Sequence, residues 1–447
     1  MSKVLLINSN TINPPVAPLA LEYLLSYLHE KGHDVFLYDM NIQQKYLSDI
    51  LKKITPDYVG ISVRNIDDSC YATAEFFLDG IKAIVSIVKE KGIPVILGGV
   101  GFSIMPREIL AYTGADAGIW GDGEEVFEKI ISKGGLLKGF IRAPFFNLNN
   151  FRPQRGFIDN FFYYQKGGMV GIETTRGCNR KCIYCADPVA KGKRVRFRSV
   201  ESIVDEINQL LEQGVTHFHF CDSEFNLSME YVKSLCMAIN NSRLGEKIFW
   251  YAYGVPDVID RELAYLLKKA GCRGINFGVD HTDDRMLSFL NKKYRYEDVR
   301  RTVQTCKEEG LKVMVDLLLG APGETFDSIR KVIEDMKILE PFRVGTSYGI
   351  RVYPGTAFFE YLKNSGYQIP SSLLHPYFYL SDTLRDGIDE FIRELINGDE
   401  RFYFNAKDES RQNYNYNANK IIEDAIRDGF RGAFWDVLAM YQEKSTK

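Results

Sequence analysis

The stretch Gly171-Ile-Glu-Thr-Thr-Arg-Gly-Cys178-Asn-Arg-Lys-Cys182-Ile-Tyr-Cys185 decides the fold, because it places three cysteines directly after a predicted strand. Their spacing is C-x3-C-x2-C. Thiolates are the usual ligands of iron–sulfur clusters. Three protein ligands on a four-iron cluster leave one iron open for a small chelating molecule, as catalytic zinc sites also keep an open position. Zinc is the alternative, but it needs a fourth ligand, and no histidine lies between residues 34 and 216.

A regular alternation of strands and helices is predicted around this motif, over residues 166–365. The runs that predict strands are Met169–Glu173, His217–Phe220, Ile248–Tyr253, Gly274–Phe277, Lys312–Leu319 and Gly345–Val352. Helical periodicity is found between them, over Val200–Gln213, Met229–Asn240, Arg261–Ala270, Tyr296–Glu309 and Thr325–Leu339. Six such units predict a partial (β/α)6 barrel, with functional residues at the carboxyl ends of its strands.

Residues 1–135 show the same alternation and predict a separate, Rossmann-like α/β domain. Its predicted strands are Val4–Ile7, Asp34–Tyr38, Tyr58–Val63, Pro94–Leu97 and Ala117–Trp120. Near-continuous apolar strands indicate a parallel sheet covered on both faces, with ligands bound beyond the carboxyl ends. Each glycine at these ends could simply form a turn, but four polar or glycine-rich ends together favour a ligand-binding face. These ends are Asn8-Ser9-Asn10, Arg64-Asn65-Ile66-Asp67-Asp68, Gly98-Gly99-Val100-Gly101 and Gly121-Asp122-Gly123-Glu124.

Two further segments lie outside these predicted domains. Residues 136–165 have weak periodicity and include Pro144 and Pro153, so they are predicted to be a linker. Residues 366–447 predict a mainly helical C-terminal subdomain that closes the active site. It should contain a surface loop over Arg401–Asn419 and one or two amphipathic helices over Ile421–Gln442. Its aromatic residues either line a pocket or pack within the subdomain: Tyr403, Tyr414, Tyr416 and Trp435.

Composition narrows the class of protein. A chain of 447 residues suggests about three units. Its net charge of −3 argues against binding nucleic acid through a broad basic surface. No long apolar run predicts a membrane-spanning helix, and the N-terminus does not resemble a signal peptide, so we expect a cytoplasmic protein with reduced thiols. The five other cysteines are expected to be buried free thiols, with Cys221 of special interest because it precedes Asp222 at a strand end.

The cysteine motif, with Tyr184 before its last cysteine and a βα barrel after it, resembles the radical S-adenosylmethionine enzymes. The resemblance implies that Cys178, Cys182 and Cys185 hold a [4Fe-4S] cluster whose open iron binds S-adenosylmethionine. It further implies contacts with S-adenosylmethionine from residues at the strand ends: Tyr184, Asp222, Ser223, Glu224, Asp280, Gly320 and Arg351. Local structural roles are the alternative, since Asp222 and Asp280 could cap helices and Arg351 could form a structural ion pair.

An α/β domain ahead of such a barrel resembles the cobalamin-dependent subgroup of that family. The resemblance implies a B12-binding domain whose cofactor contacts are Asn10, Arg64, Asn65, Asp67, Gly98, Gly99, Gly121, Gly123 and Glu124. Many B12-binding domains carry D-x-H-x-x-G, but the only H-x-x-G here is His29–Gly32, which lies before the second strand. We therefore predict cobalamin bound without a protein histidine ligand, with the loop Arg64–Asp68 under the corrin. A nucleotide-binding or flavodoxin-like domain is the alternative. This chain, however, lacks both the G-x-G-x-x-G motif after the first strand and the phosphate-loop motif G-x-x-x-x-G-K-[ST].

The resemblance implies a C-methyltransferase that methylates an unactivated carbon through a 5′-deoxyadenosyl radical and methylcobalamin. A cobalamin-dependent cyclase or ring-rearrangement enzyme is the alternative within the subgroup, and a cobalamin-binding sensor or carrier is the alternative of another class. Methylthiotransferases share the barrel, but only Cys70 lies in the first domain, so a second cluster is not expected there. The implied partners are an external one-electron reductant such as flavodoxin or ferredoxin and a substrate that is a protein side chain, a lipid or a small metabolite.

Overall fold

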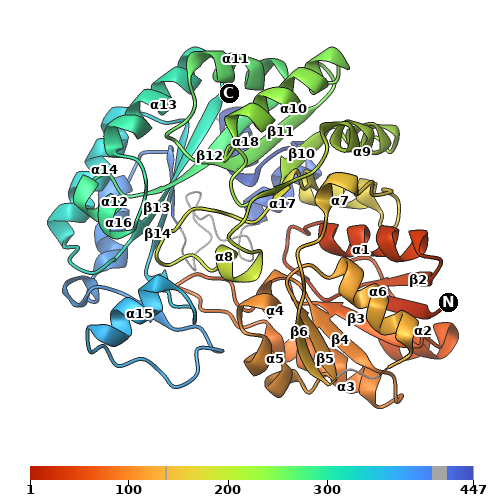
Figure 1. Ribbon diagram of the computed structural model, residues 1–447. Coiled ribbons are helices and arrows are strands. Elements are labelled where there is room, and N and C mark those ends of the chain that lie inside the picture. Colours follow the sequence, from red (N-terminus) through yellow and green to blue (C-terminus); the bar gives the residue numbers. More distant parts are fainter. Residues whose placement is uncertain (136–137, 405–419, 446–447) are drawn as a thin grey trace.

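The structure is a computed structural model that describes residues 1–135, 138–404 and 420–445. Figure 1 shows two α/β units, the N-terminal one in red and orange and the second in green and teal. This arrangement confirms the predicted α/β fold class, with the two sheets in the predicted order along the chain. No helix in the described part of the chain is both long enough and apolar enough to cross a membrane.

The first unit is a parallel sheet with the strand order β2-β1-β3-β4-β5-β6. Its strands are β1 (Lys3–Asn8), β2 (Asp34–Asp39), β3 (Tyr58–Ser62), β4 (Val95–Gly98), β5 (Ala117–Trp120) and β6 (Gly139–Arg142). Helices cover both faces: α1 (Leu19–Glu30), α2 (Leu47–Ile54), α3 (Leu78–Lys89), α4 (Val100–Ile104), α5 (Pro106–Thr113) and α6 (Glu124–Lys133). Successive residues of β1 point to opposite faces of the sheet, so Leu5 packs in one hydrophobic core and Leu6 in another. Both faces of the sheet are therefore apolar.

The sixth strand was not expected, because it lies in the segment predicted as a linker. Strand β6 pairs in parallel with β5, from Ala117↔Gly139 to Trp120↔Arg142. The remainder of the segment contains a short 3₁₀ turn, η1 (Leu148–Asn150), and helix α7 (Asn160–Gly167). The sheet of the first unit therefore extends to residue 142, and the connection to the barrel begins after it.

The second unit is a parallel sheet with the strand order β17-β14-β13-β12-β11-β10-β7. The first six strands in the chain match the prediction: β7 (Val170–Ile172), β10 (His217–Phe220), β11 (Phe249–Gly254), β12 (Cys272–Asp280), β13 (Lys312–Leu319) and β14 (Arg343–Tyr348). The outer helices include α9 (Val200–Glu212), α10 (Met229–Asn241), α11 (Arg261–Lys269), α12 (Asp284–Phe289), α13 (Tyr296–Glu308) and α14 (Phe326–Leu339). Alternate residues of β13, such as Val315 and Leu317, pack in the core under these helices, so Asp316 faces the barrel interior.

The predicted strand Gly345–Val352 is interrupted after Tyr348. Residues 350–351 form a separate strand, β15 (Ile350–Arg351), which pairs antiparallel with β16 (Phe378–Tyr379). Helix α15 (Ala357–Asn364) lies between these two strands in the chain, and η2 (Asp382–Leu384) and α16 (Ile388–Ile396) follow β16. Tyr348 is therefore the last residue of this chain segment in the barrel sheet, and Arg351 lies outside that sheet.

The C-terminal segment adds a seventh strand to the barrel sheet and packs Trp435 against the amino end of β12. Strand β17 (Phe402–Phe404) pairs with β14, so Tyr403 is buried in the sheet and the surface loop predicted from Arg401 is wrong for these residues. Tyr414 and Tyr416 lie outside the described residues. Helices α17 (Lys420–Arg427) and α18 (Phe434–Ser445) match the predicted amphipathic helices. Trp435 packs so closely on β12 that a Cβ on Gly274 would overlap its ring.

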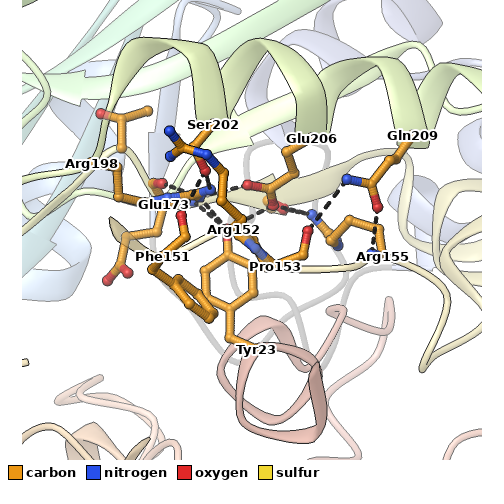
Figure 2. Close-up of polar contacts among 12 residues, drawn as sticks. Tyr23, Phe151, Arg152, Pro153, Arg155, Glu173, Arg198, Ser202, Glu206 and Gln209 are labelled. Carbon is orange, nitrogen blue, oxygen red and sulfur yellow. Dashed lines mark hydrogen bonds and ion pairs between the residues drawn. The ribbon is translucent and has the colours of Figure 1, made fainter. Parts of the chain in front are cut away.

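Buried ion pairs join the two units where the connecting segment crosses them. Arg155 contacts Glu22 of α1 and Glu206 of α9, each at 2.6 Å, and all three side chains are fully buried. Figure 2 shows that Tyr23 of α1 also reaches Glu206, to which its hydroxyl donates a hydrogen bond of 2.7 Å. Arg198 completes the set with a contact of 2.5 Å to Glu206. Ion pairs and hydrogen bonds are stronger in the low dielectric of a protein interior, so this buried group holds the two units in a defined relative position.

Candidate active site

A cavity of about 690 Å³ lies between the two units, at the carboxyl ends of the strands of the first. Arg64 and Asn65, which follow β3, line it from the first unit. His219 and Asp316 are among the inward-facing barrel residues that line it from the second. Residues 433–435, at the start of α18, close it from below, at the amino ends of the barrel strands. The C-terminal segment therefore forms the floor of the cavity.

The cysteine loop lies between β8 (Thr175–Arg176) and the short helix α8 (Asp187–Ala190). Gly177 has a φ of 95°, and a Cβ at this position would overlap the carbonyl oxygen of Arg194, so only glycine fits. The backbone N–H of Cys178 donates to Gly192 at 3.1 Å. All three cysteines are free thiols, and burial raises the pKa of Cys178 to about 11. Within the described ranges, no three His, Cys, Asp or Glu side chains gather closely enough to hold a single metal ion.

Asp222 fixes the start of the cysteine loop. Its carboxylate accepts hydrogen bonds from the backbone N–H groups of Thr174 and Thr175, both at 2.8 Å, and from the Thr174 hydroxyl. Burial raises its pKa to about 7. Asp222 does not cap the following helix, because the N-cap of α10 is Ser228. Asp222 and the adjacent Ser223 both line the cavity.

Glu224 is the predicted site residue whose carboxylate is available for a ligand. Its Oε2 atom is buried and has no hydrogen-bond partner among the described residues. Burial raises its pKa to about 7, with Lys292 and Arg180 opposing that shift. A buried acceptor without a donor is unfavourable unless a ligand supplies one. The amino group of S-adenosylmethionine is such a donor, so this position fits the predicted ligand. The neighbouring Ser223 instead donates to Asp187 at 2.6 Å.

Tyr184 and Asp280 form a buried group with a lysine that the sequence did not reveal. The Tyr184 hydroxyl donates to the Asp280 carboxylate at 2.6 Å, and Lys292 lies 2.8 Å from the same oxygen. Asp280 has a φ of 69°, next to an irregularity in the pairing of β12 with β13. The lysine charge compensates the carboxylate at the mouth of the barrel. Asp280 is no helix cap either, since Asp283 caps α12.

Gly320 begins the loop after β13 with a φ of 99°. The backbone N–H groups of Gly320 and Ala321 donate to the Glu324 carboxylate at 2.7 and 2.6 Å. His281 lies 3.2 Å from the other oxygen of that carboxylate. Glu324 therefore shapes this loop from within.

The strand ends of the first unit that were predicted to contact cobalamin contain glycines, none of which is among the described residues that line the cavity. Gly99 has a φ of 100°, and a Cβ there would lie 2.7 Å from the carbonyl oxygen of Val63. Gly121 has a φ of 97° and donates its N–H to the Ser103 hydroxyl at 3.0 Å. Gly98 and Gly123 have open space where a side chain would be, which leaves room for a ligand to approach the backbone. Asn10 instead bonds locally, accepting from the N–H of Ile12 at 3.2 Å.

Three residues that were predicted to contact cofactors instead form ion pairs between the two units. Arg351 forms an ion pair of 2.9 Å with Asp67, and its other nitrogens donate to backbone carbonyls, so the structure favours the alternative role of a structural ion pair. Glu124 lies 2.9 Å from Arg176 of the cysteine loop. None of these predicted contacts, Arg351, Asp67 and Glu124, is among the described residues that line the cavity. No sequence motif could reveal these pairs, because their members are far apart in the chain.

Comparisons with known proteins agree with this division of the chain. The family model of the B12 binding domain matches residues 6–131, and that of the radical SAM superfamily matches residues 172–336. The chain is 30% identical over 439 residues to a tryptophan 2-C-methyltransferase from Streptomyces laurentii, covering 78% of this chain and 73% of that protein. It is 28% identical over 375 residues to an uncharacterized methyltransferase from Pyrococcus horikoshii, covering 77% and 78%.

Solved structures show the same likeness over the whole chain. The radical S-adenosylmethionine methyltransferase TsrM from Kitasatospora setae, with tryptophan and a S-adenosylmethionine analogue bound, has a TM-score of 0.90, with 28% identity over 99% of this chain and 98% of that one. The cobalamin-dependent enzyme OxsB shares the fold, with a TM-score of 0.70 at 16% identity over 89% of this chain and 67% of that one. Taken with the two domain matches, this likeness shows that the chain belongs to the cobalamin-dependent radical S-adenosylmethionine methyltransferases, whose cofactors are cobalamin, a [4Fe-4S] cluster and S-adenosylmethionine.

Proposed function

We propose that this protein transfers a methyl group to a carbon atom of a small aromatic substrate held in the cavity between its domains. The observation that carries the proposal is the composition of that cavity, which both cofactor domains line. Tyr251, Phe434 and Trp435 give its lower part an aromatic surface, and Tyr253 at the carboxyl end of β11 also lines it. The relative from Streptomyces laurentii acts on tryptophan, which supports an aromatic substrate of similar size.

When bound, cobalamin and S-adenosylmethionine supply the transferable methyl group. We propose that Cys178, Cys182 and Cys185 hold the cluster and that Glu224 accepts a hydrogen bond from the amino group of S-adenosylmethionine. Lys292 holds the Asp280 carboxylate and the Tyr184 hydroxyl in fixed positions beside that ligand. Positioning of this kind is the main contribution that a protein makes to cofactor chemistry.

On the opposite side of the cavity, Arg64 and Asn65 are the proposed contacts with the face of the corrin. The loop Arg64–Asp68 contains no histidine, which supports cobalt bound without an axial histidine from this loop. Trp435 and Phe434 exclude water from below. An external one-electron donor of the flavodoxin or ferredoxin class is the proposed reductant, and a cytoplasmic location is proposed with it.

The test is anaerobic turnover of reconstituted protein with S-adenosylmethionine labelled in its methyl group, a reductant and L-tryptophan. We expect S-adenosylhomocysteine and a labelled product in equal amounts, and neither with a Cys182→Ala variant. If fully loaded protein forms no S-adenosylhomocysteine with L-tryptophan or with extracts of the native host, the proposal is wrong. The predicted radical route further requires one 5′-deoxyadenosine for each methylated product. A methylated product without 5′-deoxyadenosine would refute that route alone.

A further inference from the structure

The barrel interior contains a carboxylate that the cofactor sites do not use. Asp316 lies in the middle of β13, facing inward, and lines the cavity. A Cβ on Gly345, its partner in β14, would overlap the Asp316 carboxylate, so the glycine leaves the room that this carboxylate occupies. Both features are costly unless the carboxylate has a function there, because a central strand position normally carries an apolar side chain.

Among the residues that the structure describes, no cation is paired with this carboxylate. In the described part of the chain, no Lys, Arg or His side chain forms an ion pair with Asp316, and the charged group that acts on it most is Asp280, which has the same sign. Together with burial, this raises the pKa of Asp316 to about 7. Buried carboxylates are normally paired with a cation or bound to a metal.

A second acceptor lies beside it. Asn276 of β12 is 4% exposed and lines the cavity, and its side chain is near enough to Asp316 to lower the pKa of that carboxylate in part. The Oδ1 atom of Asn276 has no hydrogen-bond partner among the described residues. A carboxylate without an ion-pair partner, next to an acceptor without a donor, fits a group that carries several N–H donors and a positive charge.

The surroundings indicate what such a group is attached to. Gly274 precedes Asn276 by two residues on the same face of β12, and its missing side chain admits the ring of Trp435. Tyr251, also inward-facing, packs edge-on against Trp435 with ring centroids 5.6 Å apart. An aromatic surface therefore lies directly below the pair of acceptors.

We propose that Asp316 and Asn276 bind the ammonium group of the substrate, so that the substrate class is aromatic amines. This assignment rests on the proposed function, because it concerns the substrate of that same cavity. A neutral ligand group, such as a ribose hydroxyl of S-adenosylmethionine, is the competing use of Asp316.

The test compares two probes of the same shape that differ in charge. Tryptamine carries an ammonium group, whereas 3-propylindole has a methyl group in its place. Binding of each is measured by calorimetry to cluster- and cobalamin-loaded protein, in the wild type, in Asp316→Asn and in Asp205→Asn. Asp205 is an exposed carboxylate on α9 and serves as the matched control.

We expect the wild type and Asp205→Asn to bind tryptamine at least tenfold more tightly than 3-propylindole, and Asp316→Asn to bind the two within twofold. The affinity for S-adenosylmethionine should be unchanged in Asp316→Asn. Equal binding of the two probes by the wild type, or binding of neither, overturns the proposal. It is also overturned if Asp316→Asn keeps its preference for tryptamine, or loses affinity for S-adenosylmethionine instead.

Methyl transfer is assayed separately with the same probes, which distinguishes the two proposals. Protein that prefers tryptamine but forms no S-adenosylhomocysteine supports the ammonium site and contradicts the proposed function. Methylation of 3-propylindole as fast as of tryptamine supports the proposed function and overturns the ammonium site.

Discussion

Replacing Glu206 with glutamine removes the carboxylate on which the junction between the two domains depends. The side chain of Glu206 contacts Arg155 at 2.6 Å, Arg198 at 2.5 Å and the Tyr23 hydroxyl at 2.7 Å. Glu22 is the second carboxylate of this fully buried group, so two carboxylates face two guanidinium groups. In Glu206→Gln, one carboxylate is left to compensate both arginines.

The expected cost follows from that imbalance. Breaking a buried ion pair by removing one partner destabilises a protein by roughly 3–5 kcal/mol, because the other charge remains buried. A loss of 1 kcal/mol lowers Tm by about 2–4 °C for a unit of 150–250 residues, which is the size of the barrel domain. We therefore expect Tm to fall by about 6–20 °C. The glutamine keeps the shape of the side chain, so packing contributes little to this loss.

Calorimetric unfolding of the reconstituted protein measures this effect. Glu212→Gln is the matched control, because it makes the same chemical change at an exposed position of the same helix, α9. The control should unfold within about 1 °C of the wild type. If Glu206→Gln unfolds within about 2 °C of the control, the buried ion pairs do not hold the domains together, and the reasoning is refuted.

Three further predictions concern the cavity and its surroundings. Because burial raises the pKa of Asp316 from 3.8 to about 7, its ionised form destabilises the fold above that pH, and the penalty fades as the pH falls toward 4. Asp316→Asn should therefore stabilise the ligand-free protein by at most about 4 kcal/mol at pH 8 and by little at pH 4. Urea unfolding at the two pH values measures this difference, and a loss of stability at pH 8 would contradict it. Arg351→Met should lower the free energy of unfolding by roughly 3–5 kcal/mol, because it leaves Asp67 buried and unpaired. If Arg351 instead contacts S-adenosylmethionine, the variant should lose affinity for that ligand at unchanged stability. Gly177→Ala should abolish iron loading, since its Cβ would overlap the Arg194 oxygen, and a normal iron content per chain would rule this out.

Much of the fold was predictable because its signals are local. Apolar strands alternating with helices identified five strands of the first sheet and six of the second. The two missed strands are short and lie at sheet edges. Strand β6 has only a half-exposed pattern, Gly139–Arg142, and β17 consists of three aromatic residues, Phe402–Phe404, next to a polar stretch. Neither stands out from the polar or irregular sequence around it as an apolar run of the kind that identified the similarly short β4 and β5.

The site residues divide in the same way. The cysteine spacing and Tyr184 are local motifs. Of the glycines predicted at strand ends, Gly99, Gly121 and Gly320 have positive φ angles, which glycine accepts more readily than other residues. Lys292 was missed because nothing in its own stretch of sequence relates it to Asp280, which it meets only after α12 has turned the chain back. Asp67 and Arg351 were placed at strand ends as expected, yet they contact each other across 284 residues.

By itself, the sequence determined the two α/β domains and the family resemblance and predicted the cluster ligands, because strand periodicity, cysteine spacing and backbone freedom are properties of neighbouring residues. Only the tertiary structure decided which polar side chains are satisfied. Asp67, Glu124 and Arg351 are paired across the interface. Asn276 and Asp316 instead line the cavity, and Glu224 keeps a buried carboxylate oxygen for which the described chain supplies no donor. The reason is physical: the cost of a buried charge depends on what lies within a few ångströms of it, and only the folded chain brings those partners together.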